Sequence, residues 1–172
     1  CFAHNISSIP SIIKKLNSFS KSNIFILNNL KSMSGCENSQ ETKKFYKERG
    51  ITVNNIIPYH HNIIHTRIEA ESVVKWALDN KIEQLIICAP PFHIVRAFMT
   101  IVSVVIEMNC NLKIYALSGT TNDWNEEVIT HQGLNKNTCN NFIDIEIERI
   151  YKYIKKKDIL PISSIQTYLL NR

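Results

Sequence analysis

The chain has 172 residues, of which 44% are hydrophobic, and a formal net charge of +5. This length and composition suit one domain with a full hydrophobic core that needs no metal or disulfide support. The sequence has 4 glycines and lacks both G-x-G-x-x-G and G-x-x-x-x-G-K-[ST], which excludes the dinucleotide fingerprint and the P-loop. Much of the excess positive charge lies in Lys152 and Lys155 to Lys157, near the end of one predicted helix, where cations complement the helix dipole. No basic recognition helix or aromatic-rich strand is present, so we expect no nucleic-acid partner.

The five cysteines are odd in number and widely spaced, and none forms a C-x-x-C pair. This usage is typical of free thiols in a reducing compartment, so we expect a cytoplasmic protein. The chain begins at Cys1 without a methionine, which leaves open a leader or anchor removed from the N-terminus. The most apolar stretch, Ile101 to Ile106, is too short to span a membrane, and we therefore expect no transmembrane segment.

The predicted elements alternate between strand and helix along the chain. Short apolar runs predict the strands, and apolar residues at helical spacing predict the helices. This alternation is typical of an α/β fold with a doubly wound, mainly parallel sheet, helices on both faces, and a single domain over residues 1–172. In chain order we expect a strand stub at Phe2–His4, a helix at Ser11–Ser18, a strand at Asn23–Leu27, a helix at Gln40–Arg49 ended by Gly50, a strand at Val53–Ile57, a helix at Thr66–Asn80, a strand at Gln84–Ala89, a helix at Phe92–Met108, a strand at Leu112–Leu117, and helices at Asn141–Lys155 and Ser163–Leu170. The spacing of Ile143, Ile147, Ile150 and Ile154 places these apolar residues on one face of the Asn141–Lys155 helix.

The segment from Ala89 to Ala97 joins an apolar strand to the first turn of a helix. Its two prolines prevent the strand from continuing and suit the start of a helix. His93 and Arg96 are three residues apart, so they share one helix face with Thr100 and lie beside the unpaired N–H groups of the helix start. This combination predicts an anion site at Pro91 and Arg96. A structural alternative, in which Arg96 forms a salt bridge and His93 caps the turn, fits the segment equally well.

In a parallel sheet the loops after the carboxyl ends of the strands gather at one edge, where ligands bind. Four such loops, at 28–39, 58–65, 89–93 and 118–125, are rich in polar and small residues. We therefore expect the ligand site at this edge. The predicted binding residues are Ser34, Gly35, Thr66, Arg67, Pro91, Arg96 and Ser118.

The residues Thr66 to Glu69 fit a capping box, in which the Thr66 oxygen accepts from a backbone N–H and Glu69 reaches back to the cap. A helix start at the ligand edge also presents Arg67 and spare N–H groups to an anion. His93 with Glu69 is the best candidate for a catalytic acid–base pair, because both are expected at helix starts on one edge. In the plainer alternative, Glu69 only caps its helix and His93 only binds ligand.

Metal and nucleophile chemistry find weaker support. His60, His61 and His65 with Glu69 offer the nitrogen and oxygen ligands that zinc or iron would need. Their spacing matches no ligand pattern and HExxH is absent, so we predict no metal site. A metallohydrolase built on His60, His61 and His65 remains a third hypothesis, which elemental analysis of the purified protein would test. Two Ser-Gly pairs lack the nucleophile elbow G-x-S-x-G, and nothing places a base beside the cysteine that follows the first pair.

Three motifs together resemble the YdcF/SanA/ElyC-like family, a bacterial α/β group long catalogued as a domain of unknown function. Family members have a Ser-Gly-Gly type loop after an early strand, where this chain has Ser34-Gly35-Cys36. They have an Asn-Thr-x-x-Asn/Glu-Ala segment, which residues 65–70 match except at His65. They also have a Thr-Ser-x-x-His-x-x-Arg-Ala segment, to which Ala89 to Ala97 corresponds. The resemblance covers roughly Ile24 to Gly119.

The resemblance implies a Rossmann-like sheet with a pocket lined by the three motifs, and it nominates Ser34, Gly35, Thr66, Glu69, His93 and Arg96. Membrane-anchored members look like factors of envelope or peptidoglycan metabolism, whereas the small soluble type is linked to S-adenosylmethionine. For this chain we expect a soluble YdcF-like protein that binds a phosphorylated or nucleotide-like small molecule, with S-adenosylmethionine as one candidate and transferase or hydrolase chemistry if it is an enzyme. The alternative is a non-catalytic binding or interaction module linked to cell-envelope metabolism.

Overall fold

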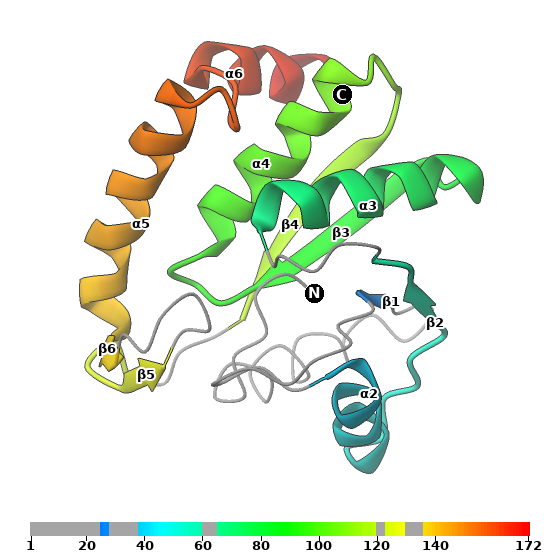
Figure 1. Ribbon diagram of the computed structural model, residues 1–172, viewed down its shortest axis with the longest axis vertical. Coiled ribbons are helices and arrows are strands. Elements are labelled where there is room, and N and C mark those ends of the chain that lie inside the picture. The colour runs from blue at the N-terminus through cyan, green and yellow to red at the C-terminus, as the bar shows by residue number, and fades with distance from the viewer. Residues whose placement is uncertain (1–24, 28–37, 60–64, 120–122, 130–135) are drawn as a thin grey trace.

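The computed structural model describes residues 25–27, 38–59, 65–119, 123–129 and 136–172, and its elements follow the predicted order (Figure 1). The strand predicted at Gln84–Ala89 has the predicted bounds, and the other predicted elements in the described part of the chain are present with shifted ends. The strand stub at Phe2–His4 and the helix at Ser11–Ser18 lie outside the described residues. The elements are β1 (Phe25–Leu27), α2 (Ser39–Glu48), β2 (Asn55–Ile57), α3 (Thr66–Asp79), β3 (Gln84–Ala89), α4 (Ile94–Glu107), β4 (Lys113–Ser118), β5 (Glu127–Ile129), β6 (Lys136–Thr138), α5 (Cys139–Lys155) and α6 (Ile162–Asn171).

The strands form three pairs. β1 pairs with β2 and β3 pairs with β4, in both cases in parallel, whereas β5 and β6 form an antiparallel pair that the sequence did not predict. Among the described residues no ladder joins the first pair to the second. The mixed α/β class with parallel strands is therefore confirmed, and one continuous doubly wound sheet is not seen in this part of the chain.

The unit of β1, α2 and β2 has a small core of its own. Asn38 caps α2 because its side-chain oxygen accepts from the N–H groups of Gln40 and Glu41, each at 3.0 Å, and the Glu41 carboxylate accepts in turn from the Asn38 N–H. Gly50 follows the helix at φ 77°, a conformation that glycine adopts without steric cost, as the sequence predicts for a C-terminal glycine. Tyr46 is the largest side chain in the core of this unit.

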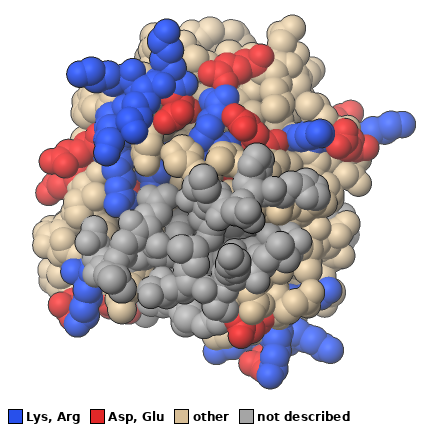
Figure 2. All heavy atoms as spheres, in the orientation of Figure 1, with Lys and Arg blue, Asp and Glu red and all other residues tan. Residues whose placement is uncertain are grey.

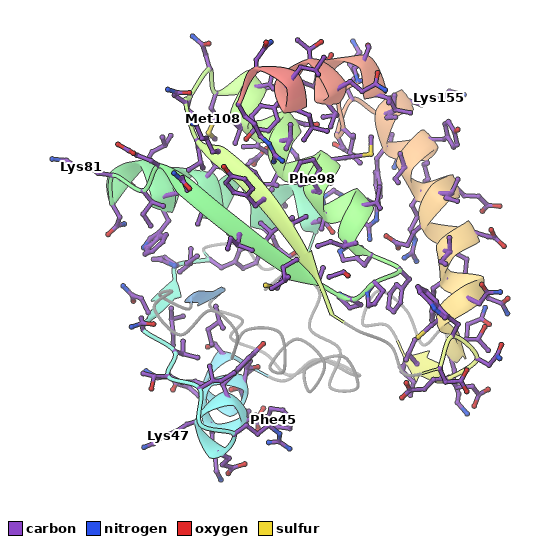
Figure 3. All side chains as sticks on the ribbon, turned by 180° about the vertical axis from the view of Figure 1, so that it is seen from behind. Phe45, Lys47, Lys81, Phe98, Met108 and Lys155 are labelled. Carbon is purple, nitrogen blue, oxygen red and sulfur yellow. The ribbon has the colours of Figure 1, made fainter. Side chains whose placement is uncertain are left out.

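The main core lies between the β3–β4 pair and the helices α3 and α4, which pack against each other on one face of it (Figures 1 and 3). Ala70 and Ala77 on α3 and Ala97 on α4 are fully buried, and their small side chains allow the two helices to lie close together. Figure 3 shows the opposite face of the pair, which no described helix covers over much of its length. Ile86 and Tyr115, paired in register, are exposed there. The sequence predicted helices on both faces of the sheet. In the described part of the chain, helices cover one face of β3–β4.

The outer edge of β4 is closed by side chains from α6. The N–H of Ile114 donates to the Tyr168 hydroxyl at 2.7 Å, and that hydroxyl donates to the Leu112 carbonyl at 2.8 Å. The Arg172 guanidinium donates to the Ile114 carbonyl and lies over the Tyr115 ring, 4.7 Å from its centroid. Side chains here satisfy backbone groups that a further strand would otherwise pair.

Replacing Tyr168 by phenylalanine is expected to lower the free energy of unfolding by about 1–3 kcal/mol, because one backbone donor and one acceptor of the β4 edge lose their partner. Urea denaturation followed by circular dichroism measures the change. Tyr151→Phe is the matched control, because Tyr151 lies on α5 and is 64% exposed. Equal losses in the two variants would contradict the role assigned to the Tyr168 hydroxyl.

The buried face of α5 differs from the prediction. Spacing predicted an apolar stripe at Ile143, Ile147, Ile150 and Ile154, but Ile147 is 46% exposed. The residues that α5 buries are Cys139, Phe142, Glu146 and Ile150. The helix is rotated relative to the prediction because Glu146 has cationic partners inside the protein.

The basic residues Lys152 and Lys155 to Lys157 are all exposed near the end of α5, in the region where Figure 2 shows Lys and Arg side chains gathered at the upper left. Acidic side chains are interspersed among basic ones over the rest of the described surface in that view. None of the helices in the described ranges is long and apolar enough to cross a membrane.

Candidate functional site

The candidate site is built on the turn between β3 and α4. Pro90 ends β3, and its carbonyl accepts from the N–H groups of His93 at 2.9 Å and Ile94 at 3.0 Å. These bonds close a turn, so α4 begins at Ile94, two residues later than predicted, and Pro91 lies in the turn and not in the helix. His93 is the N-cap residue, but its side chain makes no capping bond.

Glu146 of α5 is the centre of a buried cluster of charged groups. Its Oε2 lies 2.8 Å from Nδ1 of His93 and 2.6 Å from Nε of Arg96, and its Oε1 lies 3.2 Å from Nη2 of Arg96. Arg149, one turn further along α5, reaches Oε1 with its Nη1 at 2.6 Å. The side chains of His93, Arg96 and Glu146 are 2%, 3% and 5% exposed, so bulk water screens these contacts weakly.

The surroundings lower the pKa of both Glu146 and His93, for different reasons. Burial acts to raise the pKa of Glu146, but hydrogen bonds from His93 and Arg96, together with the positive charge of the Arg96 guanidinium, outweigh it and hold this pKa well below its usual range. Burial and the neighbouring charge of Arg96 lower the pKa of His93, against the pull of Glu146. At neutral pH the stable state is therefore an ionised Glu146 that accepts a hydrogen bond from a neutral His93.

The second ring nitrogen of His93 lacks a partner. Nε2 is buried and makes no hydrogen bond with any residue in the described ranges. The backbone N–H groups of Val95 and Arg96, in the first turn of α4, also find no acceptor in this part of the chain. Buried polar atoms are normally paired, so this Nε2 is a candidate for a hydrogen bond with a ligand.

Thr66 contacts the same cluster from α3, and Glu69 lies on that helix within the influence of the Arg96 charge. The Thr66 hydroxyl accepts from Nη1 of Arg96 at 3.0 Å. The predicted capping box at Thr66 and Glu69 is wrong, because the N-cap of α3 is His65, whose Nδ1 accepts from the Arg67 N–H at 3.2 Å. Burial raises the pKa of the Glu69 carboxyl to about 7, with the charge of Arg96 acting in the opposite direction.

The structure brings Thr66, His93 and Arg96 together and places Ser118 at the same edge, in register with Ala89. The carboxylate that contacts His93 is Glu146; no contact joins His93 to Glu69 among the described residues.

Arg67 faces away from this cluster. Its Nε donates to Glu71 at 2.7 Å, its Nη1 donates to the Asp158 carbonyl at 3.2 Å, and its Nη2 pairs with Glu107. These bonds join α3 to α4 and to the turn before α6, so the structure gives this predicted binding residue a structural role. The Thr100 hydroxyl likewise makes a structural hydrogen bond, donating to the Arg96 carbonyl at 2.7 Å.

The remaining predicted residues cannot be placed in the site. Ser34 and Gly35, and the histidines His60 and His61, lie outside the described residues. His65 packs its ring edge-on against Tyr153, with 5.5 Å between centroids. No group of three or more metal-ligating side chains occurs among the residues that the structure describes.

Sequence reasoning missed Glu146, although it is the centre of the cluster. Its one local signal is its place between Phe142 and Ile150 at a spacing of four residues, which makes an acidic residue part of a buried helix face. Arg149, three residues further on, adds a cation to the same face.

We compared the chain with models of known protein families, with curated proteins and with solved structures, and none of the three comparisons finds a match.

Proposed function

We propose that this protein binds a phosphorylated or nucleotide-like small molecule at the carboxyl end of β3, and that His93 is the acid–base group of a transferase or hydrolase acting on it. The observation that carries the proposal is the buried Nε2 of His93, which has no partner among the described residues, while the other ring nitrogen is fixed by Glu146 at 2.8 Å. A histidine held at one nitrogen by a carboxylate, with the other nitrogen left without a hydrogen-bond partner, has the arrangement of a general base.

The charge of the cluster favours an anionic ligand. Arg96 and Arg149 share a single carboxylate, Glu146, so these three side chains carry one positive charge in excess. The unpaired N–H groups of Val95 and Arg96 add the positive end of the α4 dipole. In this proposal Arg96 attracts the ligand by its positive charge and not by direct hydrogen bonds, because its guanidinium already donates to Glu146 and Thr66.

Glu69 is the natural second acid–base group. A carboxyl with a pKa of about 7 is partly protonated at neutral pH and can donate a proton, whereas His93, with its lowered pKa, can accept one. The YdcF-like resemblance nominates the same residues and adds S-adenosylmethionine as a candidate ligand.

Thermal-shift measurements with AMP, ATP, S-adenosylmethionine and farnesyl diphosphate test the proposal. At least one compound is expected to raise the Tm by about 3 °C or more at concentrations far above its Kd. His93→Asn is the informative variant. The asparagine amide can donate to Glu146 in place of Nδ1, and the substitution removes Nε2. We expect this variant to keep its Tm without ligand and to lose most of the ligand-induced rise.

One further variant complements this test. His93→Gln places a polar atom near the position of Nε2 but gives up the Glu146 contact, so we expect it to retain more of the ligand response than His93→Asn. Arg96→Ala is unsuited as a binding variant, because it takes a principal partner from the buried Glu146 and would destabilise the fold.

A second candidate is a non-catalytic interaction module linked to the cell envelope. Its support is the full engagement of Arg96 by Glu146 and Thr66, which leaves the predicted anion-binding guanidinium occupied within the fold. If none of the compounds shifts the Tm of the unmodified protein, the proposed binding function fails and this candidate replaces it.

A further inference from the structure

The tautomer of His93 constrains which group of a ligand can meet this residue. Glu146 Oε2 accepts from Nε of Arg96 at 2.6 Å and lies 2.8 Å from Nδ1 of His93. An ionised carboxylate has no proton to donate, so the hydrogen between Oε2 and His93 belongs to Nδ1. A neutral imidazole carries one N–H only, and Nε2 therefore presents a bare lone pair.

A second proton on this ring is disfavoured by its surroundings. The imidazole is 2% exposed, and the Arg96 guanidinium shares the same carboxylate oxygen. Of the groups that face His93, Arg96 on α4 and Arg149 on α5 are cationic, and Glu146 is the anion that balances one of them. Nε2 is thus a buried acceptor, and an acceptor that lacks a donor costs about 1–3 kcal/mol.

We propose that the ligand presents a hydrogen-bond donor, a hydroxyl group, to Nε2 of His93, and that it is therefore a phosphate ester of a polyhydroxy compound such as a sugar or nucleoside phosphate. This inference rests on the proposed function and narrows its ligand class. An ionised phosphate oxygen cannot occupy the position beside Nε2, because two acceptors would then face each other.

The phosphate has a separate place in this arrangement. The N–H groups of Val95 and Arg96 follow His93 directly in the first turn of α4, and Val95 is exposed. Backbone N–H groups at a helix start favour an anion. The ligand therefore needs two kinds of group: an anion for the helix start and a hydroxyl donor for the histidine that precedes it.

Calorimetric titration with matched pairs of phosphate esters tests this assignment. The pairs are glycerol 3-phosphate with propyl phosphate and ribose 5-phosphate with pentyl phosphate, which differ in their hydroxyl groups and share the phosphate. In at least one pair the hydroxyl-bearing ester is expected to bind about tenfold more tightly, the equivalent of one hydrogen bond to a buried acceptor. His93→Asn is expected to abolish this preference and to leave the affinity for the alkyl phosphate unchanged.

The outcomes separate this inference from the proposed function. If both members of every pair bind equally, or if the preference survives in His93→Asn, the donor assignment is overturned while phosphate binding stands. If no ester binds, the proposed function fails together with the inference. A nitrogen-15 NMR spectrum of histidine-labelled protein at pH 7.5 gives a check that needs no ligand: a proton found on Nε2 of His93 instead of Nδ1 overturns the assignment.

Discussion

Replacing Glu146 by glutamine is expected to lower the free energy of unfolding by about 3–5 kcal/mol, the largest loss that we predict for a single substitution in this chain. The carboxylate pairs with Arg96, which is 3% exposed, and glutamine keeps the size of the side chain while removing its charge. Arg149 is less buried and can turn toward water, but Arg96 cannot, so a charged guanidinium would remain buried without its counter-ion. Denaturant unfolding at pH 7 measures the loss.

Glu148→Gln is the matched control, because Glu148 lies on the same helix and is exposed. A surface substitution of this kind is expected to change stability by less than about 0.5 kcal/mol. The double variant Arg96→Met, Glu146→Leu should recover at least half of the loss, because removing both charges leaves no unpaired ion in the core. Similar stabilities for Glu146→Gln and Glu148→Gln would contradict the buried ion cluster.

The effect of Glu146→Gln also depends on pH in a defined direction. The ordinary pKa of a glutamate is 4.5, and the pKa of Glu146 lies well below it in the folded protein. The stability from this carboxylate is therefore fully present above the ordinary pKa and is lost as the pH falls through the folded pKa. We expect the difference between the unmodified protein and Glu146→Gln to shrink in acid and to be constant between pH 6 and 8.

Local signals in the sequence were sufficient for the elements around the site. The end of β3 was predicted because Pro90 and Pro91 cannot continue a strand, and the end of α2 was predicted to within one residue because Gly50 supports a positive φ. The start of α4 was misplaced by two residues because the Pro90 carbonyl accepts from His93 and forms a separate turn. The β5–β6 pair was not predictable in this way, because each strand is three residues long and too short to show a period of two.

The sequence predicted some residues of the candidate site and missed its central carboxylate. His93, Arg96 and Thr66 were found because helix starts after parallel strands converge at one edge, which is a property of the fold class. Glu146 was not found, because it lies 50 positions after Arg96 and an acidic residue in a helix is ordinarily assigned to the solvent face. Assigning helix faces by hydrophobicity alone also put Ile147 on the apolar face of this helix, although it is exposed. Only the partners on α4 show why α5 buries a carboxylate and exposes an isoleucine.

Replacing Glu69 by glutamine is expected to stabilise the protein at pH 8 by about 1–3 kcal/mol and to have little effect at pH 5. Burial raises the pKa of Glu69 from 4.5 to about 7, so the folded protein binds a proton at pH 5 that the unfolded chain has released in part. This favourable contribution is complete below pH 4.5 and is lost as the pH rises through 7, where the folded state must hold a partly buried carboxylate. Glutamine does not titrate and avoids that penalty.

Denaturant unfolding of both proteins at pH 5, 6, 7 and 8 measures the effect, with Glu83→Gln as the control because Glu83 is an exposed carboxylate before β3. The difference between Glu69→Gln and the unmodified protein should grow with pH, whereas the Glu83→Gln difference should stay flat. A flat profile for Glu69→Gln would show that this carboxyl is ionised throughout the range and cannot donate a proton at neutral pH. His93 would then be the single acid–base group at the start of α4, and the chemistry available to the site would be restricted to proton acceptance.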